Sequence, residues 1–181
     1  MKALVYTGTN ASEIRDVAAP VAADGQSVID LSFCGICGSD MHAWHGHDER
    51  RIPPLVLGHE AVGTALTGPL AGKRVAINPL MSCNDCDFCD SGNHHLCTSR
   101  ELIGMRYPGA FAEQVMIPES NLTRLDDHLS FQDAALAEPL AVAVRTVGVA
   151  ESGGATRDSR SVILGGGAIG LLCAKVMKAG G

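Results

Sequence analysis

The sequence contains few aromatic residues and no excess of positive charge. Phe, Trp and Tyr make up 4% of the 181 residues, so the chain lacks the aromatic surfaces on which single-stranded nucleic acids stack. The 14 Lys and Arg residues are outnumbered by 20 Asp and Glu residues, which gives a net charge of −6. Because phosphates are bound by basic surfaces, we expect no nucleic-acid partner. The adjacent residues Arg50 and Arg51 are expected to lie in a solvated loop.

The sequence also lacks a long uninterrupted apolar segment. Its longest apolar stretch, residues 162–174, contains four glycines and is shorter than the ~20 residues that a membrane-spanning helix requires. The first residues become polar too soon to form a signal peptide. We therefore expect no membrane partner and a cytoplasmic location. The apolar content of 46% suits a globular fold of about one domain or slightly more.

Seven cysteines are many for a protein of a reducing compartment, where metal binding and catalysis are commoner than disulfides. Four of them form the pattern Cys83-x2-Cys86-x2-Cys89-x7-Cys97. Four thiolates at short spacing are typical of a closed, tetrahedral structural zinc site. An iron–sulfur cluster is one alternative, although such runs usually continue with x3-Cys-Pro. Disulfides are the other alternative, which the short spacing disfavours.

Two further cysteines form the pair Cys34-Gly-Ile-Cys37. A C-x-x-C pair occurs in thioredoxin-like redox proteins, where a helix N-terminus stabilises the reactive thiolate. Here the pair closes a predicted strand, and the following residues 38–42 are a poor start for a helix. A dithiol redox protein that uses Cys34 and Cys37 therefore stays an alternative. Cys173 lies in an apolar predicted helix and is expected to be an inert core residue.

The tripeptide Gly58-His59-Glu60 offers ligands that complement Cys37. Adjacent side chains on a regular strand point to opposite faces, so His59 and Glu60 can approach one metal only where the backbone is irregular. Gly58 permits such an irregularity. Together, these residues predict a catalytic zinc site with sulfur, nitrogen and oxygen ligands, whereas spacing alone also allows an unrelated surface dipeptide.

The first 125 residues have the pattern of short strands between Gly- and Pro-rich turns. The predicted strands are Lys2–Tyr6, Ser27–Cys34, Ala61–Ala65, Arg74–Asn78 and Ala112–Ile117. This pattern predicts an antiparallel barrel or sandwich, with long functional loops at 37–58 and 79–108.

The pattern becomes helical after Ser130. Ser130 and Asp133 resemble a capping box, and Pro139 predicts a kink at Glu138 between two helical pieces, the second ending near residue 149. A polar linker over 151–159 then leads to a predicted buried strand at 161–164. The motif Gly165-Gly-Gly167-Ala-Ile-Gly170 and an apolar helix follow. This is the opening of a βαβ unit, of which the chain holds only the first strand and helix.

These motifs together resemble those of one family, the zinc-containing medium-chain alcohol and polyol dehydrogenases. The matching segments are Gly35–His42, Gly58-His59-Glu60, the four cysteines between Cys83 and Cys97, Glu138-Pro139-Leu140-Ala141, and Gly165 to Gly170. The Glu-Pro-Leu segment is similar to that of the polyol branch, which includes sorbitol and idonate dehydrogenases.

The resemblance implies a mixed α and β structure. A GroES-like β-barrel catalytic domain would occupy residues 1–150. A linker and the truncated start of a Rossmann, doubly wound α/β domain would occupy residues 151–181. In similar proteins the C-terminal part of the chain completes both domains, so we expect these 181 residues alone to be inactive.

The resemblance also implies the roles of individual residues. Cys37 and His59 would bind the catalytic zinc, with Glu60 and Glu138 alternating as third ligand and near neighbour. Asp40 would orient His59 by a hydrogen bond to its free nitrogen. Cys34 is not a ligand in similar proteins and would be a packed thiol. The four cysteines Cys83, Cys86, Cys89 and Cys97 would hold a second, structural zinc.

The implied reaction is hydride transfer from a secondary alcohol of a polyol, sugar or sugar acid to NAD or NADP. Ser39 and His42 would carry the substrate's proton to solvent. Gly165, Gly167 and Gly170 would bind the cofactor's pyrophosphate. The acidic residue that separates NAD from NADP lies ~20 residues beyond the glycine motif, so the cofactor preference is not readable from this sequence.

The substrate is not readable in detail either. Trp44 matches sorbitol-type enzymes, but Ala43 departs from the aromatic residue that some of them have. The loop 102–109, with Arg106 and Tyr107, is expected to help shape the substrate pocket. A dimer or tetramer is expected from the resemblance, although no sequence feature encodes it. Besides the redox protein, a zinc-stabilised binding module without catalysis stays an alternative.

Overall fold

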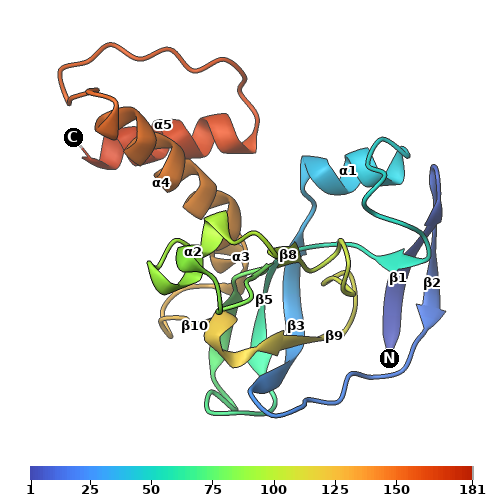
Figure 1. The fold of residues 1–181 in the computed structure, drawn as a ribbon. Helices are drawn as coiled ribbons and strands as arrows, with labels where there is room; N and C mark the ends of the chain where they lie inside the picture. Colours follow the sequence, from blue (N-terminus) through green and yellow to red (C-terminus); the bar gives the residue numbers. More distant parts are fainter. Residues whose placement is uncertain (181) are drawn as a thin grey trace. The chain divides into compact units, whose positions relative to one another are not determined.

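The computed structural model describes residues 1–180, and its contacts divide the chain into two compact units, Met1–Ala135 and Leu136–Gly181 (Figure 1). The strands of the first unit are β1 (Lys2–Gly8), β2 (Ala11–Asp16), β3 (Gln26–Gly35), β4 (Leu55–Val56), β5 (Glu60–Ala65), β6 (Arg74–Ile77), β7 (Leu80–Met81), β8 (Glu101–Leu102), β9 (Gln114–Pro118) and β10 (Leu122–Arg124). Its helices are α1 (Gly38–Trp44), α2 (Asp87–Asp90), α3 (Phe131–Ala134) and the 3-10 turns η1 (His94–Leu96) and η2 (Glu119–Asn121). The second unit contains α4 (Ala137–Ser152) and α5 (Ala168–Gly180).

A curved antiparallel sheet in the order β10-β6-β5-β3-β9 forms the centre of the first unit (Figure 1). Apolar side chains from its strands pack into one core, in which Ile29, Val75 and Ile117 are completely buried. Burial of each such side chain contributes about 1.5–3 kcal/mol. β3 pairs with β5 from Ile29 opposite Ala65 to Gly35 opposite Glu60, with a register shift between Leu31 and Phe33. This antiparallel, curled sheet confirms the predicted GroES-like β fold.

A smaller sheet, β2-β1-β4, is joined to the central sheet by the segment that precedes β9. The N–H of Leu4 donates to the carbonyl of Phe111 at 2.8 Å, and Ala3 forms a bridge with Ala112. Tyr6 of β1 and Ala43 of α1 are buried in a second apolar cluster. This cluster fixes α1 against the small sheet.

All five strands predicted within the first 125 residues are present, with bounds that differ by a few residues. Five further strands were not predicted: β2, whose side chains are all exposed, and the very short strands β4, β7, β8 and β10. The prediction rested on strand-like segments between Gly- and Pro-rich turns, whereas β2 is mostly polar and the other four strands have only two or three residues. The long predicted loops 37–58 and 79–108 are confirmed in part, since short elements interrupt both of them.

The expectation that residues 38–42 start a helix poorly is wrong, because α1 covers Gly38–Trp44. The carboxylate of Asp40 accepts the N–H of Cys37 at 3.0 Å, which satisfies a donor at the helix N-terminus. The buried methyl group of Ala43 then anchors the helix. The local sequence has weak helical propensity, and this cap and the packing outweigh it.

The predicted kink at Glu138 is also wrong. Ser130 caps α3 as predicted, by accepting the N–H of Asp133 at 3.1 Å, but the break between the helices lies at Ala135 and Leu136. Pro139 is the third residue of α4. Its missing N–H costs nothing there, because the first N–H groups of a helix have no intrahelical acceptor. Glu138 therefore lies in the first turn of a continuous helix.

In the second unit, α4 packs on α5. Residues 161–164 do not form the predicted strand, and Val162 and Leu164 are 85% and 94% exposed. A parallel strand requires a neighbouring strand, and within residues 1–180 none pairs with this segment. The predicted domain boundary after residue 150 stays a prediction. Among the described helices, none is both long and apolar enough to cross a bilayer.

Candidate metal centres and nucleotide-binding turn

Three predicted ligands meet where β3 and β5 lie side by side. The ligand atoms of Cys37, His59 and Glu60 all lie within 4.8 Å of one another. Cys37 precedes α1 at the end of β3, and Glu60 pairs with Gly35 of that strand. His59 and Glu60 are buried, with 4% and 9% exposure. A thiol, an imidazole and a carboxylate at this separation fit the donor set of a catalytic zinc.

The irregular backbone that this arrangement requires is found at Gly58. Its φ is +92°, a conformation that favours glycine, and a Cβ there would lie 2.5 Å from the ring of Phe111. Gly104 and Gly109 approach the backbone of Gly58 closely, and the N–H of Ala110 donates to its carbonyl at 2.9 Å. These contacts hold the turn that places both His59 and Glu60 in the group.

Asp40 connects the two ligand segments. Its carboxylate accepts the N–H groups of Cys37 at 3.0 Å and of Gly58 at 3.3 Å, and one oxygen lies 3.4 Å from Nδ1 of His59. Burial by itself raises the pKa of Asp40. The hydrogen bond and charge of His59, together with the N–H groups of Cys37 and Gly58, outweigh burial, so the pKa of Asp40 lies below its ordinary value. The contact at Nδ1 leaves Nε2 of His59 as the nitrogen that can bind a metal.

Cys34 lies beside this group and has the properties of a packed thiol. Burial, followed by the negative charge of Asp40, raises the pKa of Cys34 to about 12. Its Sγ contacts the carbonyl of Gly35 at 3.5 Å. A thiol with this pKa is a poor nucleophile at neutral pH, so the chemistry of a dithiol redox pair is disfavoured.

The second group consists of Cys83, Cys86, Cys89 and Cys97, whose sulfurs also lie within 4.8 Å of one another. The closest pairs are 3.5, 3.6 and 3.9 Å apart. A tetrahedral site with Zn–S bonds of about 2.3 Å separates its sulfurs by about 3.8 Å. A disulfide would need about 2.05 Å, and all seven cysteines are free. The N–H of Cys89 is the main cause that lowers the pKa of Cys86 to about 7, which favours a thiolate there.

The predicted proton carriers lie on α1. Ser39 is half-buried in its first turn, and His42 is exposed in its last turn, 6.4 Å from His47 between ring centroids. Glu138 belongs to the second unit, where it is half-buried at the start of α4. The roles of Ser39, His42 and Glu138 stay predictions.

The backbone of the glycine motif has a tight turn at its start, while its role in cofactor binding stays a prediction. Gly165 has a φ of +104°, and a Cβ on Gly170 would collide with the carbonyl of Gly165. Gly167 faces open space, because a Cβ added there would meet no atom within 4 Å. A tight turn followed by a close helix contact and an open glycine is the arrangement that lets a phosphate approach a helix N-terminus.

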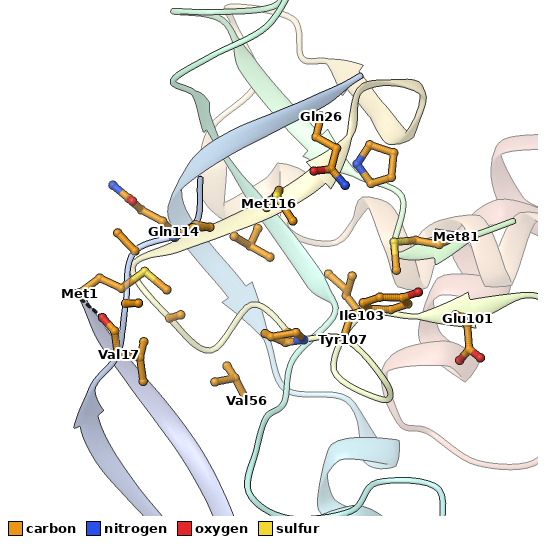
Figure 2. A pocket seen from close by; sticks show the side chains of 18 of the residues that line it. Met1, Val17, Gln26, Val56, Met81, Glu101, Ile103, Tyr107, Gln114 and Met116 are labelled. Atoms are coloured by element: carbon orange, nitrogen blue, oxygen red, sulfur yellow. Dashed lines mark hydrogen bonds between the residues drawn. The ribbon is translucent and has the colours of Figure 1, made fainter. Parts of the chain in front are cut away.

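The first unit contains a largely apolar cavity of about 740 Å³ (Figure 2). Met1, Val17, Met81, Ile103, Tyr107 and Met116 are among the residues that line it. Arg106, from the same loop as Tyr107, lines a separate cavity of about 880 Å³. Since neither cavity is lined by Cys37, His59 or Glu60, the role of the loop 102–109 in a substrate pocket stays a prediction.

Arg51 is the residue of this region that the sequence analysis misjudged. It was expected in a solvated loop, but it is 3% exposed and its guanidinium donates to both the carbonyl and the hydroxyl of Ser39. Burial of an arginine has no local sequence signal.

Comparisons with known proteins identify the same family on independent grounds. Residues 23–127 match the family model described as the alcohol dehydrogenase GroES-like domain. A probable D-xylulose reductase A of Neosartorya fischeri is 37% identical over 188 residues, a match that covers 98% of this chain and 52% of that protein. The chain therefore spans about half the length of the curated relatives it matches.

Two solved structures are similar to the whole described chain. A short chain alcohol dehydrogenase of Escherichia coli CFT073 (rspB), complexed with NADH, has a TM-score of 0.91 at 29% identity, covering 98% of this chain and 53% of that one. A protein described as a zinc-binding dehydrogenase of Sinorhizobium meliloti 1021, bound to NADP, has a TM-score of 0.86 at 31% identity, covering 99% and 53%. The chain belongs to the alcohol dehydrogenase GroES-like family.

Proposed function

We propose that this chain carries the zinc-binding part of an oxidoreductase that transfers hydride from a secondary alcohol to NAD or NADP. The observation that carries the proposal is the meeting of Cys37, His59 and Glu60 within 4.8 Å at one end of β3 and β5. The similarity to dehydrogenases solved with NADH and NADP supports the choice of cofactor. The similarity to a D-xylulose reductase supports a polyol, sugar or sugar acid as substrate.

Two zinc ions per chain are part of the proposal. Cys37, His59 and Glu60 would hold the catalytic ion, with Glu138 as an alternating ligand, and the four cysteines between Cys83 and Cys97 would hold the structural one. When bound at the first site, zinc supplies Lewis acidity, which lowers the pKa of an alcohol. The closed group of four cysteines leaves no open position and serves the fold.

The chain's own residues orient the site and remove the proton. Asp40 fixes the ring of His59 through Nδ1. Ser39, half-buried and close to Cys37 in sequence, would take the substrate's proton, and the exposed His42 one turn further along α1 would pass it to solvent. Gly165, Gly167 and Gly170 would admit the cofactor's pyrophosphate to the N-terminus of α5.

The test is a comparison of two cysteine variants in the whole protein. NAD(P)H formation is measured with a panel of polyols, sugars and sugar acids, and the same assay is repeated for Cys37→Ser and the neighbouring control Cys34→Ser. We expect Cys37→Ser to lose at least about 10³-fold in kcat/KM, because a metal ligand is removed, and Cys34→Ser to stay close to the wild-type value.

Three outcomes would contradict the proposal. If loss at Cys34 equalled loss at Cys37, a dithiol redox protein would be favoured. If a zinc-loaded protein reduced neither cofactor with any substrate of the panel, a zinc-stabilised binding module would be favoured. If Cys37→Ser retained wild-type turnover, the ligand set would be wrong.

A further inference from the structure

Arg51 is a buried cation that the proposed mechanism does not use. Its guanidinium forms an ion pair with Asp48 at 2.6 Å, and its Nε donates to the carbonyl of Gly104 at 2.9 Å. Nη1 and Nη2 donate to the carbonyl and to the hydroxyl oxygen of Ser39, both at 3.3 Å. Burying a guanidinium costs free energy unless its N–H donors are satisfied. The contacts of Arg51 with Asp48, Gly104 and Ser39 offset this cost.

The negative partner of Arg51 is ionised at neutral pH. Asp48 also accepts two hydrogen bonds from the exposed Arg50, at 2.8 and 3.0 Å. These bonds are the main cause that lowers the pKa of Asp48 to about 2. The Arg50 side chain pairs with the same carboxylate as Arg51 but is 70% exposed, so it offers a matched control for Arg51.

Donor chemistry fixes the direction of the contact with Ser39. Arginine has five N–H donors and no acceptor, so the hydroxyl oxygen of Ser39 must accept from Nη2. Its single proton then points elsewhere, where His42 can accept it, and its second lone pair stays free to accept a hydrogen bond from a substrate hydroxyl. Nη1 also donates to the carbonyl of Ser39. One planar guanidinium therefore binds both the backbone and the side chain of this residue.

The same arginine touches the support of the opposite ligand segment. Gly104, whose carbonyl accepts from Nε, packs on the backbone of Gly58, where a Cβ on Gly104 would lie 2.9 Å from the carbonyl of Gly58. Gly58 directly precedes His59. Arg51 thus links Ser39, two positions after Cys37, to the turn that positions His59.

We propose that Arg51 is a positioning residue. It holds the Ser39 hydroxyl in the orientation in which its free lone pair faces the substrate hydroxyl and its own proton can pass on. This inference rests on the proposed function, because it gives Ser39 its role in proton removal. Arg51 does not touch substrate or zinc. It occupies one lone pair of the Ser39 hydroxyl. As this hydroxyl gives its own proton to His42 and takes the substrate's proton on its second lone pair, the guanidinium stabilises the partial negative charge on its oxygen.

The test is a double-mutant cycle in the whole, zinc-loaded protein with Arg51→Met, Ser39→Ala and both together. We expect Arg51→Met to lower kcat about 10-fold and to increase the solvent deuterium isotope effect, with an unchanged KM for NAD(P) and unchanged zinc content. In the Ser39→Ala background the same substitution should change kcat by less than about 2-fold, because its target is gone. Arg50→Met, the control, should leave kcat and the isotope effect at wild-type values.

A second measurement does not depend on turnover. In the metal-free protein, Arg51→Met should lower the urea midpoint of unfolding less in the Ser39→Ala background than in the wild type, because one hydrogen bond is already lost. If Arg51→Met does not fold, Arg51→Lys takes its place in both cycles. Lysine can pair with Asp48 but cannot present a planar fork to Ser39, so kcat should fall by a similar factor.

The results separate the two proposals. Equal losses in both Ser39 backgrounds, or full activity of Arg51→Lys, would overturn the role of Arg51 while leaving the dehydrogenase intact. A wild-type protein that binds zinc but transfers no hydride would overturn the proposed function instead.

Discussion

Gly35 shows how a single residue can control a metal group without touching a metal. It lies opposite Glu60 in the pairing of β3 with β5, and a Cβ at this position would collide with the carboxylate of Glu60. The backbone of Gly35 is not in the left-handed region, so alanine would cause no backbone strain there. The absence of a side chain therefore serves the placement of Glu60.

We expect Gly35→Ala to turn the Glu60 carboxylate away from Cys37 and His59. Zinc bound at the first site should fall well below one per chain, with at least about 10-fold lower turnover, whereas the melting temperature of the metal-free protein should change little. Elemental analysis and thermal unfolding measure these effects. Gly38→Ala is the control, because a Cβ added there would meet nothing within 4 Å. Full zinc content in Gly35→Ala would show that the Glu60 carboxylate is not a ligand.

Among the elements, the segment around α2 and η1 differs most from the rest of the first unit. α2 has four residues and η1 has three, and neither is long enough to be stable alone. Of the four cysteines here, Cys89 and Cys97 are buried, although large side chains such as Phe88 and Leu96 are 41% and 46% exposed. The segment lacks a core of its own, so we expect its order to come from a metal bound by the four sulfurs.

We therefore expect Cys97→Ser to unfold residues 83–97 while the central sheet persists. Limited proteolysis should cut this segment at least about 10-fold faster than in the wild type, and the far-ultraviolet circular dichroism of the strands should be retained. Cys173→Ser in α5 is the control. Because Cys173 belongs to neither group of metal ligands, this substitution should leave the cleavage rate unchanged. Cooperative loss of the whole sheet in Cys97→Ser would contradict this view of an independent lobe.

At the scale of the whole molecule, the two metal groups are built in different ways. The four cysteines are supplied by one continuous segment of fifteen residues, whereas Cys37 and His59 come from separate segments joined by a paired sheet. Each group brings its donor atoms within 4.8 Å of one another. The two sites should accordingly lose their metal independently.

We expect elemental analysis of protein purified without chelator to find about two zinc ions per chain. Cys97→Ser and Cys37→Ser should each retain about one, because the donor sets share no residue. Iron in place of zinc would contradict the assignment of the four-cysteine group. If the wild-type protein held only one zinc ion and Cys37→Ser kept it, the first group would hold no metal.

The sequence predicted those features whose physical cause is local. The four cysteines meet because a short loop closes on them at little entropic cost, and Ser130 caps α3 because its partner Asp133 is three residues away. The five main strands were predicted from short segments between Gly- and Pro-rich turns. Prediction failed where tertiary contacts compete with local propensity, as at α1, at the break before Ala137 and at residues 161–164.

The kinds of ligand, their order along the chain and the family to which they point all follow from the amino-acid sequence. Only the tertiary structure decided that Arg51 is buried against Ser39, that Asp40 joins Cys37 to His59, and that Glu60 needs the empty space at Gly35. The physical reason is that these contacts depend on the register of β3 against β5 and on the packing of loops far apart in sequence. Such distances are set by the folded core and not by any segment alone.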